Sequence, residues 1–260
     1  MSEEPMVEEF DTVASWTADA VEELGQDHAL PAACRGSGSP AALRWLADRM
    51  GLAPGMRLLD SGAGVGGPAR LVQETHGVQP TLVDPMEGAC RAAERLFGFR
   101  ALVGDGAALP VGSGEHDAGW SLGVLCTVED KAAQVAELRR VVAGGGAVGL
   151  LVFVRTVEEL TDPPEGNHFV TADELDGLLR GAGLDVVDRA WLGDFDDPPQ
   201  DWQDAADAVD DVVRREHGDS DSFQEAQRNQ DRMIRLLRDG SVAGRLVVCR
   251  VPGDDVGRDT

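Results

Sequence analysis

Hydrophobic and polar residues follow two different periods along this chain. Short apolar runs bounded by glycine, proline or aspartate predict strands, and segments with apolar residues three or four positions apart predict amphipathic helices. Leu43, Leu46 and Met50, for example, are spaced for one face of a helix. The expected strands lie at 56–60, 81–84, 101–103, 118–124, 146–154, 184–192 and 244–251. The expected helices lie at 4–24, 40–50, from 66 onwards, 86–98, 130–142, 171–182 and within 200–239.

The predicted strands and helices alternate along most of the chain. Alternation of this kind favours a parallel sheet with helices on both faces. Thr171 and Glu174 have the spacing of a capping box, which fixes the start of the helix after the fifth strand. A turn-rich stretch at 31–40 separates the two N-terminal helices. We therefore expect an α/β fold with a doubly wound, seven-stranded, mostly parallel sheet.

The length of the chain suits one such domain with an extension over its site, so we assign residues 1–252 to a single domain. It consists of an N-terminal helical cap at 1–50, a core at 55–192, a helical lid at 195–240 and a last strand at 244–251. The lid has two apolar helical faces, and its aspartates are expected to face solvent. These faces are made by Trp202, Ala205, Ala206, Val209, Val212 and Val213, and by Phe223, Ala226, Met233, Ile234 and Leu237. The charged tail at 253–260 is expected to be disordered.

Acidic residues dominate the charge of the chain. The formal net charge is −24, which disfavours nucleic acid and anionic membranes as partners, although an acidic surface that recruits a cationic substrate is an alternative interpretation. No run of 18 apolar residues predicts a membrane span, and the acidic N-terminus does not resemble a secretory signal. Cys34, Cys90, Cys126 and Cys249 form no CxxC motif, so we expect free, mostly buried thiols, no zinc site and a cytoplasmic location.

A glycine-rich loop follows the first predicted strand. Gly62, Gly64 and Gly66 allow a tight turn and a close backbone approach to a ligand, at the start of a helix with free N–H groups. Asp60 stands just before the loop, where a carboxylate repels a pyrophosphate but suits a cofactor that carries an amino group. The spacing GxGxGG also differs from the GxGxxG of dinucleotide-binding loops. Both features disfavour a nicotinamide-dependent dehydrogenase, which is the competing enzyme class for this sheet.

Two more acidic residues follow the next two strands. Asp84 ends the second predicted strand, and Asp105 follows the third. Carboxylates at these places can accept hydrogen bonds from the ribose hydroxyls and the adenine amino group of a nucleoside. Because the carboxyl ends of parallel strands line one crevice, we expect both residues beside the glycine loop. The sequence therefore predicts a nucleoside-containing cofactor and no metal.

These motifs resemble those of the class I, Rossmann-like S-adenosylmethionine-dependent methyltransferases, especially the small-molecule branch with its sterol, tocopherol, quinone and natural-product enzymes. The resemblance covers about 55–192 and rests on the segments 60–69, 83–86, 104–110, 116–125 and 138–146. It implies that the last strand is antiparallel and that S-adenosylmethionine is the cofactor. The residues that we assign to cofactor binding are Asp60, Gly62, Ala63, Gly64, Gly66, Asp84, Pro85, Met86, Asp105, Gly106, Ala107, Ser121 and Leu122.

The resemblance implies methyl transfer to a small-molecule acceptor. The sulfonium leaving group departs neutral, so proximity and in-line orientation can supply most of the rate, and a base is needed only if the acceptor must lose a proton. His168, after the fifth strand, is the candidate base, against the alternative of a surface histidine. Cys126 stands where many relatives have histidine, so it receives no catalytic role. The apolar lid faces predict a mostly uncharged, partly apolar acceptor rather than a cationic amine.

The sequence pattern does not determine the acceptor, the type of atom that is methylated (O, N or C) or the oligomeric state. A cofactor-binding protein of the same fold without transferase activity is an alternative, because no single residue is indispensable to the chemistry.

Overall fold

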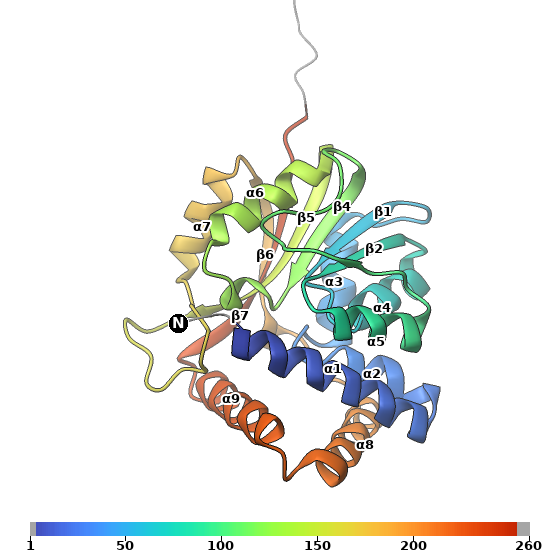
Figure 1. Cartoon of the computed structure of the whole chain (residues 1–260). Helices are drawn as coiled ribbons and strands as arrows, with labels where there is room; N and C mark the ends of the chain where they lie inside the picture. Colours follow the sequence, from blue (N-terminus) through green and yellow to red (C-terminus); the bar gives the residue numbers. More distant parts are fainter. Residues whose placement is uncertain (1–3, 254–260) are drawn as a thin grey trace, which may run out of the picture.

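The computed structural model describes the backbone of residues 4–253 and the side chains of residues 11–253. Figure 1 shows a central sheet with helices on both faces, and three helices, α1, α8 and α9, gathered below one end of the sheet. The tail that we expect to be disordered lies, from residue 254, outside the described residues. Among the described residues, no helix is long and apolar enough to cross a membrane.

Seven strands form one sheet in the order β3-β2-β1-β4-β5-β7-β6. They are β1 (Arg57–Ser61), β2 (Gln79–Asp84), β3 (Leu102–Val103), β4 (His116–Leu122), β5 (Val142–Arg155), β6 (Asp185–Trp191) and β7 (Val242–Arg250). The neighbouring strands from β3 to β5 are parallel, whereas β7 is antiparallel to both β5 and β6. The prediction of a doubly wound, mostly parallel sheet with an antiparallel last strand is confirmed.

The helices lie where their apolar spacing predicts them, with one addition. They are α1 (Glu4–Leu24), α2 (Ala29–Ala33), α3 (Pro40–Met50), α4 (Gly67–His76), α5 (Glu87–Phe97), α6 (Lys131–Val141), α7 (Ala172–Gly181), α8 (Gln200–His217) and α9 (Asp221–Arg238). The expected capping box at Thr171 and Glu174 starts α7. The prediction of turns over 31–40 is wrong in part, because the first residues of this stretch belong to the short helix α2. Pro31 is buried within that helix.

The fifth strand is also longer than predicted. It begins at Val142, which pairs with His116, and its register shifts before Ala118 pairs with Ala147. The glycines at 144–146 therefore lie within an irregular part of the strand.

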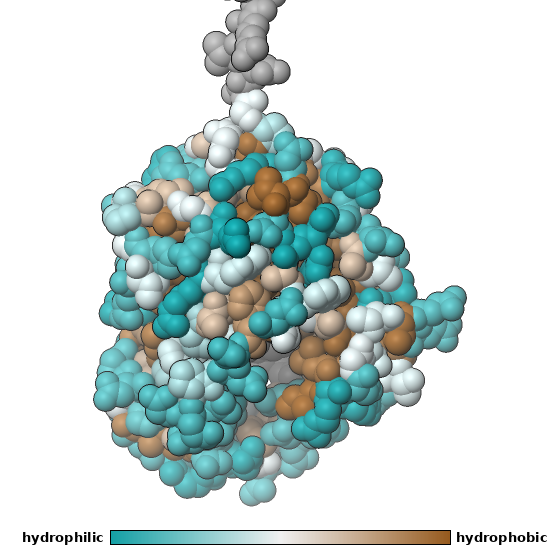
Figure 2. Space-filling model, turned by 180° about the vertical axis from the view of Figure 1, so that it is seen from behind, coloured by the Kyte–Doolittle hydropathy of each residue, from teal (hydrophilic) through white to brown (hydrophobic). Residues whose placement is uncertain are grey.

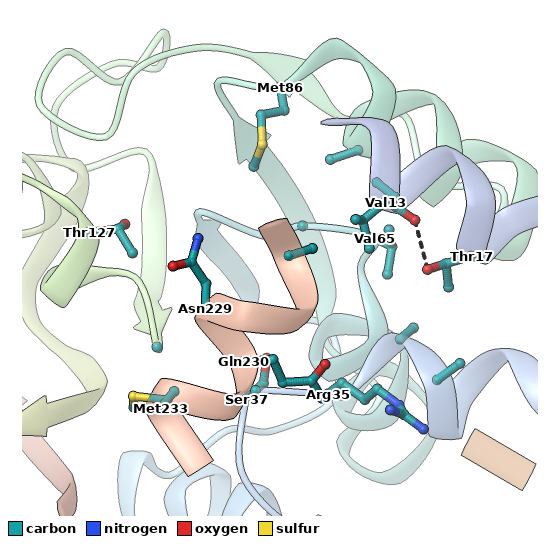
Figure 3. A pocket seen from close by; sticks show the side chains of 18 of the residues that line it. Val13, Thr17, Arg35, Ser37, Val65, Met86, Thr127, Asn229, Gln230 and Met233 are labelled. Atoms are coloured by element: carbon teal, nitrogen blue, oxygen red, sulfur yellow. Dashed lines mark hydrogen bonds between the residues drawn. The ribbon is translucent and has the colours of Figure 1, made fainter. Parts of the chain in front are cut away.

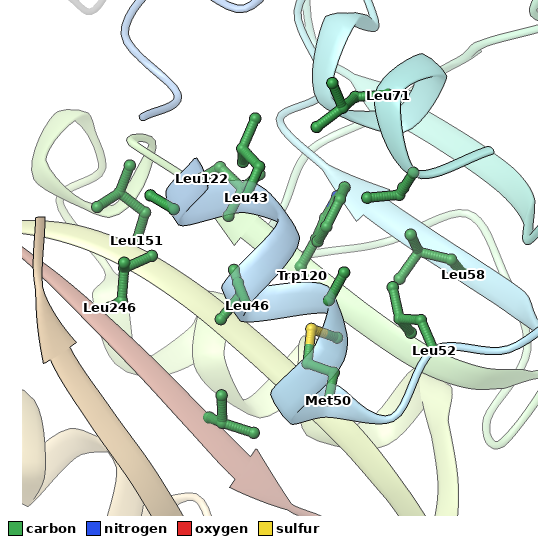
Figure 4. Close-up of a cluster of buried hydrophobic side chains, with 14 of the residues drawn as sticks. Leu43, Leu46, Met50, Leu52, Leu58, Leu71, Trp120, Leu122, Leu151 and Leu246 are labelled. Atoms are coloured by element: carbon green, nitrogen blue, oxygen red, sulfur yellow. The ribbon is translucent and has the colours of Figure 1, made fainter. Parts of the chain in front are cut away.

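Two apolar layers hold the sheet between its helices. On one face, side chains of α3 and α4 pack around the fully buried Trp120 of β4 (Figure 4). On the other face, α6 and α7 pack against β5 through residues such as Leu138, Leu150 and Leu175, which are 0% exposed. Burial of apolar surface on this scale is the main favourable term in folding. The two layers fix the carboxyl ends of β1, β2 and β4, where the candidate site lies.

A third cluster joins the N-terminal cap to the lid. Ala14, Ala18 and Val21 of α1 are buried together with residues of α5 and with Val209 and Val212 of α8. The helix α1 thus packs between the core and the lid, so cap and lid form one wall.

Candidate active site

The glycine-rich loop turns sharply at the end of β1. Gly62, Gly64 and Gly66 have φ angles of 74°, 54° and 85°, in the left-handed region that favours glycine. A Cβ on Gly62 would lie 2.4 Å from a methyl of Val124. The loop can therefore lie this close to the end of β4 only with glycine at that position, and it leads directly into the first turn of α4.

Asp84 holds this loop to the end of β2. Its Oδ2 accepts a hydrogen bond from the Gly64 N–H at 2.8 Å, and its Oδ1 accepts one from the Met86 N–H at 3.0 Å. Burial raises the pKa of this carboxyl, while the two N–H donors lower it. Each carboxylate oxygen has a second lone pair, so Asp84 keeps acceptor capacity beyond its two backbone partners.

Asp60 lies beneath the same loop. It is 2% exposed, and among the described residues its Oδ2 has no hydrogen-bond partner. Burial raises the pKa of Asp60 to about 7; the nearby Trp120 lowers it, and the negative charge of Asp84 raises it. Two carboxyls so close to the loop disfavour a pyrophosphate and suit a ligand with a cationic sulfonium and amino group.

A cavity of about 500 Å³ opens in front of the loop (Figure 3). Gly62, Ala63, Gly64 and Met86 line it from the core, and Gly123 lines it from the end of β4. The walls contributed by the cap and the lid include Val13, Ala14, Thr17, Val213, Phe223, Ala226, Gln227, Gln230 and Met233. One continuous cavity thus joins the glycine loop to the lid.

The structure divides the other predicted cofactor residues between the surface and the interior. Asp105 is exposed, and its Oδ1 accepts the Ala107 N–H at 2.8 Å, which leaves its other oxygen available. Pro85 is exposed too, and Gly106 is half-buried beside Gln134. None of these residues lines the cavity, nor do Asp60 and Asp84 themselves. Their assignment to the cofactor stays a prediction.

Ser121, Leu122 and Gly66 are in the interior. Ser121 is 1% exposed and donates its hydroxyl proton to the Ser61 carbonyl at 2.9 Å, so it connects β4 to β1. Leu122 is buried in the layer around α3, and Gly66 packs toward Leu82 below the loop. At the end of β4, the residue that lines the cavity is Gly123, which directly follows the predicted residues Ser121 and Leu122.

His168 lies in the loop between β5 and α7. Its backbone N–H donates to the carbonyl of Cys126 at 2.6 Å, and Cys126 lines the cavity, as does Asn167. The His168 side chain is exposed and is not part of the lining. The structure thus places this histidine beside the cavity but not in it, and the proposed base stays a prediction.

The predicted lid faces are only partly correct. Val213, Phe223, Ala226 and Met233 line the cavity as expected. In contrast, Trp202 packs against the core layer around α3, and Ile234 and Leu237 are 42% and 38% exposed. Periodicity identifies a helical face, but it does not tell which part of that face meets the core, the cavity or the solvent.

Sequence reasoning also missed an ion pair in the cavity wall. Arg35, in the segment after α2, pairs with Asp210 of α8, and its second guanidinium nitrogen lies 3.2 Å from Asp207. Both Arg35 and Asp210 line the cavity, whereas Asp210 was expected to be solvated. Only the fold brings these residues together, since they are 175 positions apart.

Comparisons with known proteins agree with this geometry. A family model described as a methyltransferase domain matches residues 59–150, which include the glycine loop, Asp84 and Asp105. Residues 59–150 thus match a methyltransferase domain. The chain is 29% identical over 153 residues to squalene methyltransferase 1 of Botryococcus braunii, a match that covers 56% of this chain and 39% of that enzyme. The chain spans less than half the length of the curated relatives that it matches.

Solved structures share the fold of this chain. The [4+2]-cyclase SpnF superposes with a TM-score of 0.69 and 21% identity, over 90% of this chain and 93% of that protein. The geranyl diphosphate C-methyltransferase of Streptomyces coelicolor, in a complex that includes S-adenosylhomocysteine, gives 0.58 and 16% over 81% and 78%. The match to the cyclase therefore covers more of this chain than the match to the geranyl diphosphate C-methyltransferase.

Proposed function

We propose that the chain transfers a methyl group from S-adenosylmethionine to a small, mostly uncharged, partly apolar acceptor. The observation that carries this proposal is the single cavity that joins the glycine loop of a methyltransferase domain to a largely apolar lid. The cofactor would lie at the loop end, and the acceptor would lie between it and α9. Asp84 and Asp105 would bind the ribose and the adenine, as the family resemblance implies.

The residues of this chain would act mainly by position. S-adenosylmethionine supplies an activated methyl group on a cationic sulfur. The backbone at Gly62–Gly64 would leave room for it, Asp60 and Asp84 would stabilise its positive charge from behind the loop, and α1 and α9 would exclude water from the reacting atoms. Holding two reactants in line in this way can supply most of the acceleration that such a reaction needs.

The acceptor end of the cavity favours an uncharged molecule over a cationic amine. Phe153, Phe223 and Met233 contribute apolar surface there. The acidic residue in this wall, Asp210, already forms an ion pair with Arg35. Acceptor binding that weakens strongly as salt is raised would contradict this assignment, because it would indicate steering by exposed carboxylates.

Calorimetry in chelator followed by a methyl-transfer assay tests the proposal. We expect S-adenosylmethionine and S-adenosylhomocysteine to bind without metal, and products heavier by one methyl group to form from apolar hydroxyl or ring acceptors. Within the described residues, no group of three or more His, Cys, Asp or Glu side chains could hold a metal ion. Absence of cofactor binding would reject the proposal.

A second candidate is ring formation in the same cavity without methyl transfer. It is favoured by the [4+2]-cyclase, which matches this chain over its cap and lid as well as its core. In that case the cofactor would bind tightly and stay intact while an acyclic or large-ring substrate is converted. Product of unchanged mass from such a substrate would decide between the two candidates.

We further propose a cytoplasmic location and a role in small-molecule metabolism. Cys34, Cys90, Cys126 and Cys249 are all unbridged and buried, which accords with a reducing compartment. The net charge of −24 supports the absence of nucleic acid among the partners.

A further inference from the structure

The cavity-facing side of α9 has an unusual order of side chains. Six residues of α9 line the cavity, and each lies three or four positions from another member of the set: Phe223, Ala226, Gln227, Asn229, Gln230 and Met233. The stripe is apolar at both ends and carries three primary amides in the middle, those of Gln227, Asn229 and Gln230. A helix face that only closed an apolar pocket would gain nothing from amides there, because a polar group that loses water without finding a partner is destabilising.

The side chain of Gln230 is exposed at the cavity wall, and its amide has no hydrogen-bond partner within the part of the chain that the structure describes. Gln227 donates from its Nε2 to Asp231 Oδ1 at 2.9 Å, which leaves its carbonyl oxygen unused. A primary amide offers two donor protons and one oxygen acceptor. The two glutamines therefore present unused donors and acceptors to whatever fills the cavity.

Apart from Ser37, the surroundings of these amides are apolar or already bonded. Phe153, Phe223 and Met233 line the same cavity, and the hydroxyl of Thr127 donates to the Val124 carbonyl. Figure 3 shows Gln230 and Met233 on α9, at some distance from Met86 at the cofactor end. An acceptor at this end would thus displace water from the amides while burying its skeleton against aromatic and thioether groups.

We propose that Gln230, assisted by Gln227, selects acceptors that carry a carbonyl or hydroxyl oxygen on an apolar skeleton and rejects the corresponding hydrocarbon. This inference rests on the proposed function, because it assigns α9 to the acceptor end. A site built to hydrogen-bond an oxygen discriminates against the analogue without it, since its own polar groups are then left unpaired.

The test uses 1-indanone and indane, which share one skeleton and differ in a carbonyl, as probes of the complex with S-adenosylhomocysteine. Calorimetry gives the affinity of each probe for the wild-type protein and for Gln230→Leu, which conserves most of the side-chain volume. We expect the wild type to prefer the ketone, and the ketone-to-hydrocarbon affinity ratio to fall about tenfold in the variant. Gln224→Leu is the matched control, because Gln224 is, like Gln230, an exposed glutamine of the same helix, but it does not line the cavity.

Other results would contradict either this inference or the proposed function. A wild-type complex that binds both probes equally or binds neither, or a Gln230→Leu variant that keeps the wild-type ratio, overturns the inference. If the variant weakens S-adenosylhomocysteine instead, Gln230 belongs to the cofactor end and the inference is also wrong. If the wild-type protein does not bind S-adenosylhomocysteine at all, the proposed function itself fails.

Discussion

Asp60 and Asp84 end neighbouring parallel strands, yet their environments differ. Both oxygens of Asp84 accept backbone N–H groups, which compensates for the loss of water. One oxygen of Asp60 lacks any described partner, and the pKa of that carboxyl is raised to about 7. Asp84 is therefore suited to stay charged for a cofactor, whereas the charge of Asp60 is sensitive to pH.

Substitution of Asp84 tests its assignment to the ribose. Asp84→Asn keeps one oxygen acceptor but removes the charge, so we expect cofactor binding to weaken by about 1–3 kcal/mol. The change also removes a bond to the backbone of Gly64 or Met86, so a moderate loss of stability should accompany it. Titration calorimetry measures the first effect and urea unfolding the second. Glu94→Gln on the exposed side of α5 is the control, and an equal dissociation constant for both variants would remove Asp84 from the site.

The raised pKa of Asp60 predicts a pH-dependent contribution to stability. Between the unfolded value of 3.8 and the folded value of about 7, the folded protein binds more protons than the unfolded chain, so this group destabilises the fold as pH rises through that window. Asp60→Asn removes the titration. We expect its stability relative to wild type to increase from pH 4 to pH 8 by up to about 4 kcal/mol, since each pKa unit corresponds to ~1.4 kcal/mol. Urea unfolding at both pH values measures this, and a constant difference would contradict it.

The proposed base makes a separate prediction. If the acceptor is a hydroxyl and His168 removes its proton, His168→Gln should lower turnover, change the pH profile and leave cofactor affinity unchanged. His76 provides a control, because it lies on α4 with its Nε2 3.1 Å from Asp48. Wild-type turnover of His168→Gln over the whole pH range would agree with the exposed position of this side chain and make it a bystander.

At the scale of elements, polar contacts help to attach α1 to α5. The first turn of α5 has no capping side chain of its own, and Asp11 of α1 supplies one by accepting the Gly88 N–H. Farther along, Arg95 of α5 pairs with Asp19 and Glu22 of α1. The attachment of α1 is therefore polar at the cavity end as well as apolar between the helices.

Removal of the Asp11 side chain should loosen the packing of α1 against α5. We expect Asp11→Ala to destabilise the contact by about 1 kcal/mol, the usual value of a capping interaction, and to speed hydrogen exchange in the first half of α1. Cofactor release should become faster because α1 lines the cavity. Asp11→Asn retains an acceptor and should behave nearly as the wild type. If both variants exchange at the wild-type rate, the cap does not hold α1.

Local signals predicted most of this architecture, and tertiary contacts decided what they missed. The capping box of α7, the glycine loop and the alternation of strands and helices are local in sequence. The helix α2 was missed because Pro31 and the glycines after it resemble a turn. The pairing of Arg35 with Asp210, and the selection of Val213 rather than Trp202 for the cavity, depend on how α8 packs on α1 and α2. No pattern within a single helix contains that information.

At the scale of the whole molecule, the net charge of −24 sets the response to salt. Hydrophilic residues cover most of the face seen in Figure 2. Salt weakens exposed ion pairs such as Arg215 with Glu23, but it also screens the repulsion among the excess carboxylates. We expect the second effect to exceed the first, so that potassium chloride raises the melting temperature, by about 2–4 °C for each kcal/mol gained. A melting temperature that falls from 0.05 M to about 1 M salt would contradict this balance.

The position of β7 constrains the order in which the molecule can form. This strand inserts between β5 and β6, and its partners in β5 are about a hundred residues earlier in the chain, with α8 and α9 in between. Until residues 242–250 leave the ribosome, β5 and β6 have no common neighbour, and each offers an unpaired edge to other chains. Such distant pairing makes the fold slow to complete and prone to aggregate during synthesis. Expression yield should thus depend on temperature and chaperone supply, even though the finished sheet is well packed.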